Sequence, residues 1–357
     1  MNHQSHGTQA RTGTSRRLSV AAAALTALLA GSALTLTANP ALAAGAAPVF
    51  SESAIVHDIN ILNGEYGLCA NGPVVRELPD ERSLPENTVV TANVSQKQTF
   101  TLDAEDSLAL DISQKATVRS STAAGLPTAV QLDFSARGSA VSQKSESACR
   151  GNAWVSSATT FTFRTPVPLW ATLSYTKMGK NHAEAYLHST ADGGSRPFED
   201  VYSYGLKSSG STTVLLPPGE YKGRLSGRSF LHETRATTSA AANGTVKIAF
   251  ARVGSATAAP AGNAKAYVSL GAARSCTAHV LPAKLTSSSK RVKSVSKITF
   301  AVNGKTVKTL KGKRIKRGLA VRLPIRDDAQ ASVRVTVTPK KGKGKARTVT
   351  ASYRPCS

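Results

Sequence analysis

Residues 296–310 read SKITFAVNGKTVKTL, and this stretch decides the fold class of the C-terminal part of the chain. Apolar and polar side chains alternate from Ser296 to Val302, which is typical of a strand with one face on a core. The dipeptide Asn303-Gly304 suits the two positive-φ positions of a type I′ turn. The chain then returns through residues 305–310, so the sequence predicts a β-hairpin.

The same two-residue alternation recurs along much of the chain, whereas helical periodicity is nearly absent. Turn-rich pieces at residues 120–127, 207–211 and 240–244 separate the alternating runs. Many short strands at such spacing predict an all-β protein built as two β-sandwich domains. The alternating residues are Leu108, Leu110 and Ile112; Val130, Leu132 and Phe134; Ala171, Leu173 and Tyr175; Val246, Ile248 and Phe250; Val321, Leu323 and Ile325; Val333, Val335 and Val337; and Val349, Ala351 and Tyr353.

Two short motifs resemble known bacterial modules. Residues 298–305 resemble the "xFxVNGK" hairpin of immunoglobulin-like (Ig-like) domains on exported actinobacterial proteins. Residues 212–221 resemble the "vtLpPGxY" turn of jelly-roll modules appended to secreted bacterial enzymes, including the pre-peptidase C-terminal type. These resemblances imply an N-terminal jelly-roll-like sandwich and a C-terminal Ig-like sandwich. Ig-like domains of this kind are similar to spacers and adhesive modules, so no catalytic residues carry over.

The N-terminus has the pattern of a signal peptide. Residues 1–19 carry three Arg and no acid, and residues 20–36 contain no charged residue. Ala41-Leu42-Ala43 then matches the small-residue pattern of a signal peptidase site, so we expect residues 1–43 to be removed. An uncleaved membrane anchor is the alternative, and the pair Arg16-Arg17 leaves general secretory and twin-arginine export both open.

The length of the mature chain predicts two domains. About 314 residues remain after residue 43, which is too many for one ordinary core. Residues 254–263 consist mostly of Gly, Ser, Ala, Thr, Pro and Asn, a composition that indicates a linker. We therefore expect the jelly-roll-like domain at residues 44–253 and the Ig-like domain at residues 264–357.

All four cysteines follow the predicted signal peptide, as expected for structural disulfides in an oxidising compartment. Four cysteines allow three connectivities. We prefer Cys69 with Cys149 and Cys276 with Cys356, because each bond then stays inside one predicted domain. Closing such a long loop is worth about 4 to 5 kcal/mol in the chain-entropy model.

Charge separates the two halves of the chain. Residues 276–357 hold 21 Lys and Arg against Asp327 and Asp328, whereas the whole chain has a formal net charge of +24. Ordinary surfaces mix both signs, and self-repulsion of this size favours an anionic partner that relieves it. The predicted polyanion-binding residues are Lys311, Lys313, Arg314, Lys316, Arg317, Lys340, Lys341, Lys343, Lys345 and Arg347.

The sequence offers little support for catalysis, and we predict neither a metal nor a cofactor. It contains no G-x-S-x-G motif. His57 and Asp58 would point to opposite faces of a strand. We interpret His57, like His182, His188 and His232, as an isolated surface histidine. Asp103, Glu105 and Asp106 form an acidic group that lacks the glycine and distal glutamate of an EF-hand, so we expect a solvated turn rather than a calcium site.

These observations predict a non-enzymatic protein that is secreted or associated with the cell wall, with no transmembrane segment after signal cleavage. Its partners would be anionic wall polymers or other polyanions such as anionic lipids, extracellular DNA or acidic polysaccharides. Aromatic residues are scarce among the cations, so specific nucleic-acid recognition is not expected. The alternatives are an unrecognised secreted hydrolase and a carbohydrate-binding module whose aromatic platform is Trp154, Trp170, Tyr175, Tyr186, Tyr202 and Tyr204.

The predicted cleavage site can be checked directly. We expect exported protein to begin near Ala44, because signal peptidase accepts small residues at positions 41 and 43. N-terminal sequencing of secreted material measures this, and a chain that still begins at Met1 or retains Val20 would contradict it.

Overall fold

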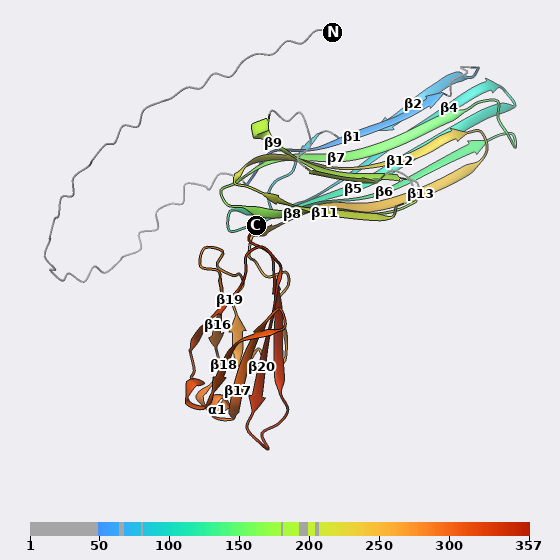
Figure 1. Ribbon diagram of the computed structural model, residues 1–357. Helices are drawn as coiled ribbons and strands as arrows, with labels where there is room; N and C mark the ends of the chain where they lie inside the picture. The colour runs from blue at the N-terminus through green and yellow to red at the C-terminus, as the bar shows by residue number, and fades with distance from the viewer. Residues whose placement is uncertain (1–48, 64–67, 80, 180, 193–198, 204–206) are drawn as a thin grey trace, which may run out of the picture. The chain divides into compact units, whose positions relative to one another are not determined.

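The protein is all-β and forms two β-sandwiches (Figure 1). The predicted signal peptide lies outside the residues that the structure describes, and so does its cleavage site. Within the described part, no helix is long and apolar enough to cross a bilayer. The computed structural model describes residues 49–63, 68–79, 81–179, 181–192, 199–203 and 207–357.

The first sandwich pairs two antiparallel sheets. As far as the chain is described, a six-stranded sheet has the order β10-β9-β12-β7-β1-β3 and a seven-stranded sheet has the order β11-β8-β13-β6-β5-β4-β2. The alternating residues predicted for β5, β6, β8 and β13 are all buried, so these strand predictions are confirmed. The elements are β1 (Phe50–Asn63), β2 (Ala70–Glu77), β3 (Arg82–Ser83), β4 (Val89–Asp103), β5 (Asp106–Ala123), β6 (Leu126–Ser142), β7 (Gly151–Thr165), β8 (Leu169–Met178), β9 (Asn181–Ser189), η1 (Thr190–Asp192), β10 (Glu199–Ser203), β11 (Ser209–Leu216), β12 (Gly219–Thr234) and β13 (Thr238–Arg252).

The turn predicted at residues 240–244 is wrong, because this segment is part of β13 and pairs with β6. Its small residues serve packing instead. A Cβ on Gly244 would lie 2.6 Å from the Phe134 ring, and a Cβ on Gly227 of β12 would lie 2.3 Å from the same ring. The glycines make room for the ring of Phe134, which is why a stretch with turn composition runs on as a strand.

A polar layer divides the core of the first sandwich. Apolar clusters lie on both sides of it, with Ile55 in one cluster and Ile59 in the other. Between them His57 Nδ1 lies 2.8 Å from Ser157 Oγ, and that hydroxyl donates to Gln114 Oε1 at 2.7 Å. Because buried polar groups need their partners, this layer favours one register of β1, β5 and β7.

The second sandwich has a five-stranded sheet of order β14-β21-β20-β17-β18 and a three-stranded sheet of order β15-β16-β19. The predicted hairpin is confirmed as β17 and β18. Asn303 and Gly304 have φ values of 49° and 79°, as a type I′ turn requires. Two short helical elements complete the domain. The elements are β14 (Ala261–Gly262), β15 (Val268–Leu270), β16 (Val280–Leu285), α1 (Ser289–Lys293), β17 (Val295–Val302), β18 (Lys305–Lys311), η2 (Gly312–Arg314), β19 (Ala320–Pro324), β20 (Ala331–Pro339) and β21 (Arg347–Tyr353).

The segment predicted as a linker, residues 254–263, carries backbone hydrogen bonds to the second sandwich. The amide of Thr257 donates to Ser352 O at 2.8 Å, and β14 pairs with β21. Part of this segment therefore forms a β-strand, although its composition is typical of a linker.

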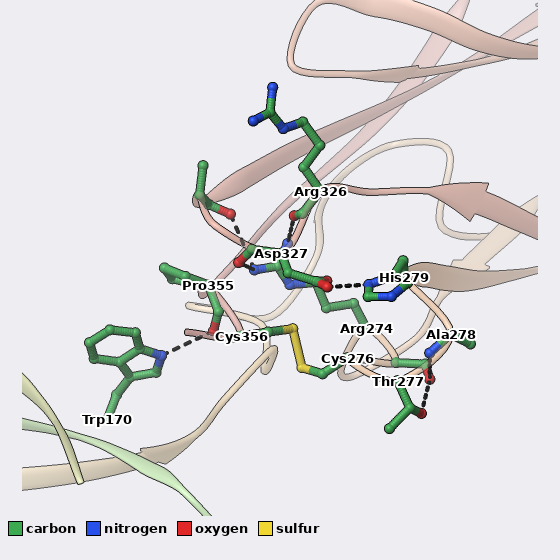
Figure 2. The surroundings of a disulfide bond; sticks show 12 residues. Trp170, Arg274, Cys276, Thr277, Ala278, His279, Arg326, Asp327, Pro355 and Cys356 are labelled. Atoms are coloured by element: carbon green, nitrogen blue, oxygen red, sulfur yellow. Dashed lines mark hydrogen bonds and ion pairs between the residues drawn. A yellow bond between two sulfur atoms is a disulfide. The ribbon is translucent and has the colours of Figure 1, made fainter. Parts of the chain in front are cut away.

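Both predicted disulfides are confirmed. Cys69 is bonded to Cys149 and Cys276 to Cys356, and each bond joins residues 80 positions apart. Near the second disulfide, the buried Arg274 donates to the carbonyls of Asp327 at 3.0 Å and Ala329 at 3.2 Å (Figure 2). Arg274 thus holds the loop before β20 against the segment that carries Cys276.

We predict that Gly227→Ala destabilises the first sandwich by about 1 to 3 kcal/mol, because the added methyl group overpacks the Phe134 ring. Gly138→Ala is the matched control, since a Cβ there meets neighbours at 3.8 Å, an ordinary contact distance. The control should change the unfolding free energy by less than about 1 kcal/mol and can be stabilising. Denaturant unfolding measures both, and equal effects would contradict the packing role of Gly227.

Candidate polyanion-binding site

The strand register of the second sandwich brings the predicted cations to one end of it. At this end Val295 of β17 pairs with Pro339 of β20, Lys297 pairs with Lys311, and Arg347 pairs with Val337. The helix α1, the turn η2 and the loop at residues 340–346 all lie at the same strand ends. Figure 1 shows α1 at the end of this sandwich away from the C-terminus.

Local structure turns these side chains outward. Ile315 is buried in the core between Arg314 and Lys316, so both of the flanking cations face solvent. On the other side of the end, Ser288 caps α1 by accepting a hydrogen bond from Arg291 N at 3.4 Å. No residue of α1 is buried. The short helix therefore adds cations to the surface, and the partly buried Val292 packs it against the core.

The group of exposed cations at this end is larger than the set predicted from the sequence. All ten predicted cations are exposed, and four further exposed cations from α1 and β17 join them. We call this surface the basic end. Its residues are Lys290, Arg291, Lys293, Lys297, Lys311, Lys313, Arg314, Lys316, Arg317, Lys340, Lys341, Lys343, Lys345 and Arg347.

The basic end has almost no compensating charge. Among the ion pairs formed by the described residues, none involves a cation of the basic end. Arg347 is held differently, because its guanidinium carbon lies 5.4 Å from the centre of the Tyr267 ring. A cation over an aromatic face keeps its charge and gains little screening from that contact. The surface therefore presents its positive charge to solvent or to a ligand.

The two acidic residues of the C-terminal part lie at the opposite end of the same sandwich. Asp327 and Asp328 lie in the loop between β19 and β20 and already have basic partners. The Asp327 carboxylate pairs with His279, and the Asp328 carboxylate is 2.8 Å from Arg326 (Figure 2 shows the first pair). Positive charge is therefore concentrated at one end of the second sandwich, and both acids lie at the other end.

Those aromatic residues of the predicted sugar platform whose side chains the structure describes do not come together. Trp154 and Trp170 lie on the outward faces of β7 and β8, which belong to different sheets of the first sandwich. Tyr175 is buried in the core. Tyr186 faces outward from β9, where its ring lies 4.7 Å from that of His188. Tyr204 and the side chain of Tyr202 lie outside the described residues.

His57 is a correction to the sequence interpretation, because it points into the core rather than to the surface. Asp58 points outward and accepts from Trp154 Nε1 at 3.3 Å, so the expected opposite orientation of this pair is confirmed. Burial lowers the pKa of His57, and the nearby Arg82 lowers it further. Its partner Ser157 is fully buried, which leaves this serine and histidine pair without access for a substrate.

The acidic group at residues 103–106 does not gather around one point. Asp103 accepts from Glu105 N at 2.8 Å within the turn. Asp106 is buried and accepts from Ser147 Oγ and Ala148 N, and the bond from Ser147 lowers the pKa of this carboxyl. Asp106 therefore anchors the segment next to Cys149 and is not part of a solvated turn.

No protein-family model matches the chain, and no curated protein matches it. Among solved structures it is similar to a glycoside hydrolase domain, Endo-D from Streptococcus pneumoniae R6, with 11% identity and a TM-score of 0.19 over 68% of this chain and 38% of that chain. It is also similar to the adhesin domain of Epf from Streptococcus pyogenes, with 9% identity and a TM-score of 0.19 over 67% of this chain and 79% of that chain. TM-scores this low assign neither a family nor an activity.

The pKa of His57 predicts how stability depends on pH. Because its folded-state pKa lies below the ordinary value of 6.5, the unfolded chain binds a proton more readily. The histidine therefore contributes stability above about pH 6.5 that is lost as the pH falls through the folded-state pKa. The pKa of His182 is also lowered by burial, so it acts in the same direction.

We expect the unfolding free energy to decrease as the pH is lowered from about 7.5 to about 5. The decrease should be smaller in His57→Gln, because glutamine keeps a donor for Ser157 but does not titrate. Denaturant unfolding at several pH values measures the two slopes. Parallel slopes for the two proteins would show that His57 does not control this dependence.

Proposed function

We propose that the protein is an exported, non-enzymatic binding protein that holds anionic polymers at the basic end of its second sandwich. The observation that carries this proposal is the gathering of exposed cations at one end, without a carboxylate partner among the described residues. The partners it fits are anionic wall polymers, and other polyanions with closely spaced phosphate or carboxylate groups. The predicted signal peptide would direct the protein out of the cell, either into the medium or to the cell wall.

Binding of this kind depends on charge density rather than on ligand identity. Each neutralised phosphate or carboxylate releases counterions, so affinity should fall steeply with salt. The cations come from three separate elements, namely the helix α1, the turn η2 and the Lys/Gly loop at residues 340–346, so they spread over a surface wider than one sugar or base. Such a surface selects for polymers that span several cations at once.

The disulfides support the same setting. Two closed loops of equal sequence separation stabilise the sandwiches without free thiols among the described cysteines. Extracellular proteins commonly use disulfides in this way, because the compartment keeps them oxidised. The bond at Cys276 stabilises the end of the second sandwich that lies opposite the basic end, so the binding surface itself carries no such constraint.

We expect the double variant Lys341→Gln, Lys343→Gln to bind isolated cell walls and heparin more weakly than the parent. Sedimentation with walls and heparin-column elution measure this, and both signals should fall as salt rises to about 1 M, where the Debye length is only about 3 Å. The fold should be unaffected, because exposed substitutions rarely change stability by more than about 0.5 kcal/mol.

The matched control is Lys305→Gln, Arg334→Gln, which removes the same charge from the half of the sheet near the Asn303 turn. It should retain most of the binding. Equal losses in the two variants would mean that net charge alone matters, and wall binding that survives about 1 M salt would favour the carbohydrate-binding alternative.

A further inference from the structure

A groove of about 720 Å³ lies between β18 and β19, on the side of the second sandwich next to the basic end. Leu310 and Val321 at its base are buried in the core, and Leu319 packs against the same core. Cations form its rim. They are Lys308, Lys313, Arg314, Lys316 and Arg322.

Both walls of the groove are strand edges. In the described part of the chain, β18 pairs with β17 on one side, and β19 pairs with β16 on one side. Each strand therefore has a second edge whose backbone N–H and C=O groups take no part in a ladder. Such edges accept an added strand unless something blocks them.

The charges along these edges decide which kind of strand can pair with them. A second copy of this chain would bring its own lysines, since β18 itself carries Lys305, Lys308 and Lys311. Like charges placed opposite each other in a sheet are destabilising, so the edge is protected against self-pairing. An added acidic strand would instead be attracted, because its carboxylates would lie beside the cations of the rim.

We propose that this groove binds an extended acidic polypeptide segment, which adds as a strand along the free edge of β18. Side chains of a strand alternate between two faces. One set of its residues would be small and apolar and would cover Leu310 and Val321, and the other set would carry Asp or Glu toward the rim. This proposal goes beyond polymer binding at the basic end, because it requires the backbone of β18 and not only its charge.

The rim residues Lys308 and Arg322 make the two proposals separable. Both line the groove, and neither belongs to the basic end. The test uses the full mature chain and three probes. One is a peptide of Asp-Val repeats, one is the same peptide with alternate backbone nitrogens methylated, and one is heparin, which has charge but no strand. Affinity and hydrogen exchange of the amides in residues 305–311 are measured for each.

The Asp-Val peptide should bind and slow exchange in residues 305–311, whereas heparin should bind without slowing it. Backbone methylation should weaken peptide binding about tenfold or more, because it removes donors that strand addition needs. The variant Lys308→Glu, Arg322→Glu should lose the acidic peptide and gain a Lys-Val peptide. The control Lys265→Glu, Arg334→Glu changes the same charge outside the groove and should keep the acidic peptide.

Three results would overturn the proposal. The methylated peptide could bind as well as its parent, the control could lose the peptide as completely as the groove variant, or heparin could slow exchange in β18 to the same extent. The last result would assign the groove to anionic polysaccharides instead. A different result would support two independent sites. In the variant Lys341→Gln, Lys343→Gln, heparin binding would fall while binding of the acidic peptide would persist.

Discussion

The alternation of buried and exposed side chains along antiparallel strands is the constraint on which this structure depends. In β20 it buries Val333, Val335 and Val337 and leaves Arg334 outside. Because every second residue must enter the core, the cations have no place except the outer faces, the strand ends and the loops. Strand register then decides which of them meet, and it collects most of them at one end of the second sandwich.

This arrangement connects stability with binding. A small sandwich that carries so little acid is destabilised by repulsion among its own cations, and the proposed anionic ligand would relieve that repulsion. The two acids are paired with His279 and Arg326 at the other end, so they do not screen the basic end. The first sandwich shows a contrasting use of polar groups. In its polar layer, Ser157 and Gln114 are buried, His57 is half-buried, and the three side chains are joined by hydrogen bonds that favour one strand register.

The sequence predicted the features that local chemistry decides. The Asn303-Gly304 turn and the buried alternating residues were within reach of turn preference and residue spacing. The pairing of the four cysteines followed from the predicted division into two domains, because it keeps each bond inside one domain. Tertiary packing decided the features that were missed. Residues 240–244 are a strand because Gly244 accommodates Phe134, and His57 points inward because Ser157 lies opposite it in β7. Lys297 faces Lys311 only because an irregularity at Phe300 and Ala301 shifts the hairpin register, which no turn rule indicates.

Lysine footprinting tests the account most directly. The mature protein would be acylated in solution and while bound to isolated cell walls, and the reactivity of each lysine would be compared between the two states. The account predicts strong protection at Lys311, Lys341 and Lys343, with Lys305 and Lys115 remaining reactive. Uniform protection, or protection centred on Lys115 and the rest of the first sandwich, would contradict the claim that the basic end is the binding surface.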